Sequence, residues 1–89
     1  MFKDMELPAK NFLMFAADEF KGIEELKTED VAKICGYDAI RTNQATFYLI
    51  QHGYIVVTKG KHDRISTPVK FQITDEGYKW INRTKSILP

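Results

Sequence analysis

Residues 28–38, Thr-Glu-Asp-Val-Ala-Lys-Ile-Cys-Gly-Tyr-Asp, decide the fold of this chain. Thr28 is a favoured N-cap residue, and the two acidic residues after it interact well with the positive end of a helix dipole. Gly36 keeps this helix short, because glycine readily adopts the backbone conformation that ends a helix. Asp38 can then cap a further helix over residues 39–52. Two short helices joined by so few residues are typical of a helix-turn-helix arrangement.

Upstream of this segment, residues 8–20 are expected to form an amphipathic helix. Pro8 suits the first turn of a helix, because its missing N–H costs nothing there. Apolar residues recur at helical spacing and are expected to form the buried side, namely Leu13, Ala16, Ala17 and Phe20. Residues 24–27 can add a short edge strand to a sheet that is formed farther along the chain.

Downstream of Gly53 the hydrophobic period changes from about 3.6 to 2. Residues 54–58 are β-branched and aromatic, which favours a strand, and residues 68–74 alternate apolar and polar side chains. In this second strand the inward side chains are expected to be Val69, Phe71 and Ile73, and the outward ones Lys70 and Gln72. The polar stretch 59–67 joins the two strands, so the pattern predicts a β-hairpin with a long tip.

A further helix is expected after the hairpin. Asp75 can cap it, and its buried face is expected to carry Gly77, Trp80, Ile81 and Thr84. No repeat, linker or low-complexity tract interrupts the sequence. Residues 1–89 are therefore expected to form a single α+β domain.

Three motifs give the chain a resemblance to winged-helix transcriptional regulators of the MarR/PadR type. They are the capped helix 28–36 with Ala32 four residues before its glycine, Gln51-His-Gly-Tyr-Ile55, and Phe71-Gln-Ile-Thr-Asp-Glu-Gly77. Their order and spacing cover about sixty per cent of the chain. The resemblance implies a winged helix-turn-helix with three helices, a β-hairpin wing and a C-terminal helix. It also implies sequence-specific binding of double-stranded DNA and regulation of transcription.

In such a domain the helix over residues 39–52 enters the major groove, and its first turns reach the base edges. These turns carry Arg41, Asn43 and Gln44, with Tyr48 one turn farther on. Arg41 can bond guanine O6 and N7, whereas a carboxamide can pair bidentately with adenine. A solvated helix face without any ligand is the plainer interpretation of the same residues.

The predicted wing, residues 59–67, would contact the DNA backbone or the minor groove. Its basic or titratable residues are Lys59, Lys61, His62 and Arg64, with only Asp63 opposing them. Thr28 and the N–H groups that begin its helix can hold a further phosphate. Residues 1–38 carry five Lys and Arg against nine Asp and Glu, whereas residues 39–89 carry eight against three. This division of charge favours a polyanion over a merely solvated loop.

Other classes of function find little support in the sequence. No glycine-rich phosphate loop, nucleophile elbow or set of Ser, His and Asp is recognisable, so we expect no enzymatic activity. Cys35, His52 and His62 are not at metal-ligand spacing, and no metal, cofactor or small-molecule ligand is expected. A single cysteine excludes an internal disulfide. No apolar run is long enough for a membrane or a secretory signal, so we expect a cytoplasmic protein.

Two further expectations concern partners. Ile40 and Phe47 fall on the side of their helix that would face DNA, which favours an alternative function as a protein–protein interaction module without DNA binding. A homodimer is expected, because one such module reads only a short half-site. The apolar residues available for its interface lie toward the two ends of the chain: Met1, Phe2, Met5, Phe12, Met14, Phe15, Trp80, Ile87 and Leu88. The alternative is that a small core buries them all.

Overall fold

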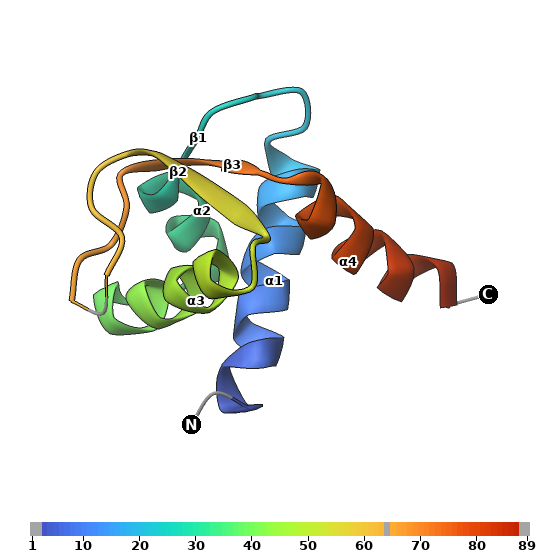
Figure 1. The fold of residues 1–89 in the computed structure, drawn as a ribbon, viewed down its shortest axis with the longest axis horizontal. Coiled ribbons are helices and arrows are strands. Elements are labelled where there is room, and N and C mark those ends of the chain that lie inside the picture. The colour runs from blue at the N-terminus through green and yellow to red at the C-terminus, as the bar shows by residue number, and fades with distance from the viewer. Residues whose placement is uncertain (1–2, 64, 88–89) are drawn as a thin grey trace.

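The computed structural model describes residues 3–63 and 65–87, and the side chains of residues 5–63 and 65–82. Over these ranges the protein is α+β, with four helices and a small three-stranded antiparallel sheet that lies along one side of the helices (Figure 1). The elements are α1 (Lys3–Glu19), β1 (Leu26–Lys27), α2 (Thr28–Cys35), α3 (Ala39–Gln51), β2 (Ile55–Lys59), β3 (Lys70–Ile73) and α4 (Asp75–Ile87). Every helix in the described part of the chain is too short or too polar to cross a membrane.

Helix α1 begins at Lys3, earlier than predicted, and Pro8 lies inside it. A proline this near the start of a helix removes only one backbone hydrogen bond, so the helix can continue past it. The buried side is also rotated from the predicted one. Ala9 and Phe12 are fully buried, whereas Phe20 is only partly so. The prediction that Phe12 belongs to a dimer interface is therefore wrong.

The turn between α2 and α3 follows the predicted local signals. Gly36 has φ +75°, the left-handed conformation that ends a helix at low cost in glycine. The carboxylate of Asp38 accepts a hydrogen bond from the backbone N–H of Arg41 at 2.8 Å, so Asp38 is the N-cap of α3 as predicted. The cap predicted for α2 is wrong. Thr28 is the first residue of that helix, and Lys27 precedes it without a side-chain capping bond.

The sheet has the order β1-β3-β2, so its central strand is the last of the three in the sequence. Leu26 of β1 pairs with Phe71, which confirms the predicted edge strand, and Val57 of β2 pairs with Phe71 from the other side. The register shifts between Val57 and Lys59, which interrupts the regular alternation at this end of the hairpin. Val69, predicted to face inward, is half exposed there.

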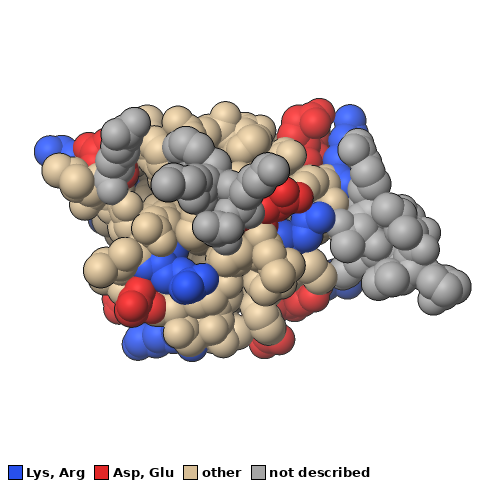
Figure 2. Space-filling model, turned by 90° about the horizontal axis from the view of Figure 1, so that it is seen from below, with Lys and Arg blue, Asp and Glu red and all other residues tan. Residues whose placement is uncertain are grey.

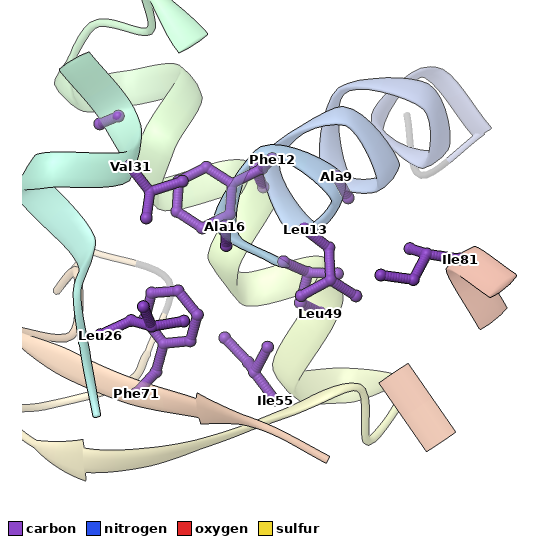
Figure 3. Close-up of a cluster of buried hydrophobic side chains, with 12 residues drawn as sticks. Ala9, Phe12, Leu13, Ala16, Leu26, Val31, Leu49, Ile55, Phe71 and Ile81 are labelled. Carbon is purple, nitrogen blue, oxygen red and sulfur yellow. The ribbon is translucent and has the colours of Figure 1, made fainter. Parts of the chain in front are cut away.

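One hydrophobic core joins the sheet to all four helices (Figure 3). Phe71 and Leu26 project from the sheet toward α1, where the rings of Phe12 and Phe71 lie 5.8 Å apart. The remaining large side chains of the core are Leu13, Val31, Leu49, Ile55 and Ile81. The core is small, and it fixes α3 with one side inward and the other toward solvent.

Helix α4 is attached to the turn between α3 and β2. The Thr74 hydroxyl donates a hydrogen bond to the carbonyl of Gly53 at 2.7 Å and accepts one from the N–H of Gly77 at 3.1 Å. Thr74 is thus the capping residue, and the prediction that Asp75 has this role is wrong. A Cβ atom on Gly77 would clash with the carbonyl oxygen of Tyr54. Only glycine therefore permits this close approach without a shift of the helix.

Candidate functional site

The outward side of α3 carries the residues predicted to read bases. Arg41 and Gln44 are exposed and Asn43 is partly buried. The opposite side faces the core with Thr42, Ala45, Thr46 and Leu49. Its two threonines are satisfied within the helix, because their hydroxyls donate to the carbonyls of Asp38 and Thr42 at 2.7 and 2.9 Å. The two buried hydroxyls of the inward side are therefore hydrogen-bonded, and the outward side is exposed to other molecules.

Arg41 lies against the turn that precedes its helix. Its guanidinium carbon is 5.8 Å from the centre of the Tyr37 ring, a cation–π distance. Tyr37 is itself fixed, because its hydroxyl donates to the carbonyl of Pro8 at 2.9 Å and its ring stacks on Phe12. The arginine is exposed, so a fixed aromatic ring supports its side chain while the charged end stays in solvent.

The β2–β3 loop, residues 60–69, folds back beside the first turns of α3 (Figure 1). The side-chain amide of Asn43 donates to the carbonyl of Asp63 at 3.4 Å, which joins the helix to the tip of the loop. Gly60 has φ +95°, and its Cβ position would clash with the backbone of Val69, so the base of the loop requires glycine. The loop is thus held in contact with α3.

Asp63 organises the tip of this loop. Its carboxylate accepts hydrogen bonds from the backbone N–H groups of Ile65 at 3.0 Å and Ser66 at 2.7 Å. The bond from Ile65, then those from Ser66 and the nearby charge of Lys61, hold the pKa of Asp63 below its ordinary value, although desolvation acts to raise it. The one acidic residue of the loop therefore has a structural role.

A shallow depression of about 400 Å³ lies between α3 and the loop. Its lining is Ala39, Ile40, Asn43, Gln44, Ile65 and Thr67. Two of these residues are large, apolar and exposed to solvent: Ile40 by 71% and Ile65 by 91%. The sequence pointed to Ile40 on this side of the helix but gave no reason to expect Ile65 beside it, because only the folded loop brings the two together.

The basic residues near the depression are few. Lys59, Lys61 and His62 are exposed, whereas Arg64 lies outside the described residues. Lys70 is in an ion pair with Glu25 at 3.4 Å. Figure 2 shows the molecule from the side of α3. Most of the described residues in this view are uncharged, and small groups of basic atoms lie next to acidic ones. The face is not uniformly positive.

Two residues of the predicted site are not part of this face. Thr28 is only 2% exposed, and its N–H donates to the carbonyl of Val69 at 3.1 Å. Its hydroxyl is buried without a hydrogen-bond partner among the described residues, so its predicted contact with a phosphate stays a prediction. Tyr48 is partly buried, with its ring centre 4.1 Å from that of His52 and 6.2 Å from that of Trp80. Burial raises the pKa of Tyr48, and we assign the residue to packing.

The rings around Tyr48 form a cluster that the sequence analysis missed. Trp80 stacks on Tyr54 at 4.3 Å, and the ammonium group of Lys10 lies 4.8 Å from the Trp80 ring. Trp80 was predicted to contact a second subunit, but it packs against the end of α3 and the start of β2. The four-residue spacing of Tyr48 and His52 was the available signal, since such residues are neighbours on a helix.

The three residues weighed as metal ligands do not form a site. Within the described part of the chain, no group of three or more His, Cys, Asp and Glu side chains could hold a metal ion. Burial raises the pKa of Cys35 to about 11, so its thiol stays protonated at neutral pH.

A second depression, of about 420 Å³, lies between α2, the start of α3 and residues 67–69.

Comparisons of the chain with models of protein families, with curated proteins and with solved structures found no match. The resemblance to winged-helix regulators therefore stays a prediction from sequence.

Proposed function

We propose that this protein is a winged helix-turn-helix domain that binds double-stranded DNA, with α3 in the major groove and the β2–β3 loop as the wing. The observation that carries the proposal is the contact between Asn43 and Asp63, which holds the loop beside the exposed first turns of α3. Base-reading and backbone-binding side chains on these two elements can thus meet one duplex together. We further propose that the domain acts as a transcriptional regulator.

The roles divide between the two elements. We assign Arg41 to a contact with guanine and Gln44 to one with adenine, because both side chains are exposed on the first two turns of α3. Asn43 joins the helix to the wing, so we assign it to positioning and not to base contacts. Lys59 and Lys61 are assigned to phosphates, which carry affinity but no sequence information.

A binding experiment with paired variants tests these roles. A duplex selected from a random library and an unrelated duplex would be titrated by fluorescence anisotropy at low salt. Arg41→Ala should weaken binding to the selected duplex by about 1–3 kcal/mol and relax the preference at one base pair. Lys61→Ala should weaken both duplexes alike and lower the salt slope by about one unit.

Lys21→Ala is the matched control, because it removes the same charge from the exposed turn after α1, far from α3 (Figure 1). It should leave both affinities and the salt slope unchanged. If Arg41→Ala weakened the two duplexes equally, Arg41 would have no role in base readout. If neither duplex bound even at low salt, the proposed function would be wrong.

The exposed isoleucines favour a second candidate function, a protein–protein interaction module that does not bind DNA. Ile40 and Ile65 lie side by side on a largely uncharged face, and Phe47 of the same helix is partly buried. Apolar patches of this kind often mark protein contacts. Failure of the DNA titration would leave this candidate in place.

A further inference from the structure

The lining of the depression between α3 and the wing is partly apolar and partly polar. Ile40 and Ile65 supply apolar walls from two separate elements, and Asn43 and Gln44 supply carboxamides on the same lining. Of these carboxamides, Asn43 is bonded to the loop and Gln44 is exposed. The depression therefore offers an apolar surface next to one amide that can both donate and accept hydrogen bonds.

The backbone at the two isoleucines is held in place, although both side chains are exposed. Ile40 lies in the first turn of α3, just after the Asp38 cap. Ile65 lies in a loop tip whose backbone is bonded to the Asp63 carboxylate at two successive N–H groups. The carbonyl of Asp63 is in turn bonded to Asn43. A ligand would thus meet a prepared surface, which lowers the entropy cost of binding.

The apolar surface is small enough to fit a single small group, and by itself it would fill only part of a stable protein interface. A stable protein interface buries about 800 Å² on each partner, whereas this patch consists of two isoleucine side chains beside carboxamides. Among the base edges in the major groove, only that of thymine carries an apolar group, the C5-methyl. Its partner adenine offers the N6 and N7 atoms that a glutamine amide pairs with.

We infer that Ile40 and Ile65 enclose the C5-methyl group of a thymine while Gln44 bonds the adenine of the same base pair. This inference rests on the proposed DNA binding, and it assigns a reading role to Ile40, which the sequence analysis attributed to a protein partner. It also places Ile65 at the tip of the wing in the major groove beside α3, while Lys59 and Lys61 contact phosphates. The domain would then distinguish a T·A pair from C·G partly through one methyl group.

Replacing thymine by uracil tests this directly, because the change removes only the methyl group and keeps every hydrogen-bonding atom. The duplex selected from a random library would be resynthesised with deoxyuridine at each thymine in turn. At one or two positions the loss of the methyl should weaken binding about three- to tenfold. In Ile40→Ser and in Ile65→Ser, the thymine and uracil duplexes should bind equally well at those positions.

Ile23→Ser is the matched control, since Ile23 is an exposed isoleucine in the turn before β1, away from α3. It should keep the full difference between thymine and uracil. If the wild-type protein bound both duplexes equally at every position, the inference would be wrong while the proposed function stood. If no duplex bound at all, both would be wrong, and the patch would be assigned to a protein partner.

Discussion

At the scale of single residues, side chains in this protein that carry charge also hold the backbone in place. Asp38 caps α3 through the N–H of Arg41, and Asp63 fixes the tip of the wing. Both carboxylates lie next to the basic residues assigned to DNA. Their negative charges lower the positive potential of this face, which agrees with its mixed surface in Figure 2. We therefore expect DNA binding with a shallow dependence on salt.

Asp63 gives this arrangement a dependence on pH. The pKa of Asp63 is lowered in the folded loop, so its carboxylate stabilises the loop at pH values above the ordinary pKa of 3.8. This stabilisation is lost as the pH falls through the lowered pKa. The amide resonances of Ile65 and Ser66 should titrate together with a midpoint below 3.8. Asp63→Asn should abolish this titration, and a wild-type midpoint at or above 3.8 would contradict the prediction.

At the scale of elements, α4 depends on a contact between two backbones. In Gly77→Ala the added methyl would meet the carbonyl of Tyr54, so α4 has to shift away from the α3–β2 turn. Helix propensity alone favours alanine over glycine by about 1 kcal/mol. Overpacking of this kind costs about 1–3 kcal/mol or more. We therefore expect a net loss of unfolding free energy, measured in urea.

The control for this variant is Asn82→Ala, an exposed position on the same helix. It should change the unfolding free energy by less than about 0.5 kcal/mol. If Gly77→Ala raised stability instead, helix propensity would outweigh the contact, and the close approach of α4 to Tyr54 would not matter for folding.

The elements also show what the sequence could and could not predict. The Asp38 cap, the end of α2 at Gly36 and the hairpin follow from local chemistry, and each was predicted. Periodicity gave the spacing of buried residues along α1 but not their side, because Phe12 and Phe20 both fit a helical stripe. Which of these two phenylalanines is fully buried depends on how the rest of the chain packs against α1.

The candidate site was predictable to the same extent. Arg41 and Gln44 were found because the first turns of one helix are defined by its cap. The contacts of Asn43 with the wing and of Tyr48 with Trp80 join residues far apart in sequence. No local pattern encodes such contacts, so the sequence could not predict them for either residue.

At the scale of the whole molecule, we propose that the protein is a homodimer. One winged module buries only about 600–1,000 Å² on DNA, which is little for recognition of a single site. Of the predicted interface residues on α1, Phe15 is exposed, whereas Met5 and Met14 are partly buried against the core. Leu7, which was not predicted, is also exposed on this helix. Of the other predicted interface residues, Met1, Phe2 and Leu88 and the side chain of Ile87 lie outside what the structure describes.

Light scattering at micromolar concentration tests the dimer. The wild-type protein should have about twice the 10.3 kDa mass of one chain, and Phe15→Ser should shift the equilibrium toward the monomer. Ile23→Ser is again the control and should leave the mass unchanged. A wild-type mass near 10.3 kDa, both with and without DNA, would contradict the proposal.

The strand order has a consequence for how the chain is made. Because β3 is the central strand, neither β1 nor β2 has a partner until residues 70–73 have been synthesised. The three helices that precede β3 can associate earlier, while both edge strands wait with unpaired backbone groups. Such edges readily pair with other chains. Chains that end before residue 70 should therefore aggregate. In the completed chain, β3 pairs with both edge strands, and Phe71 joins the core.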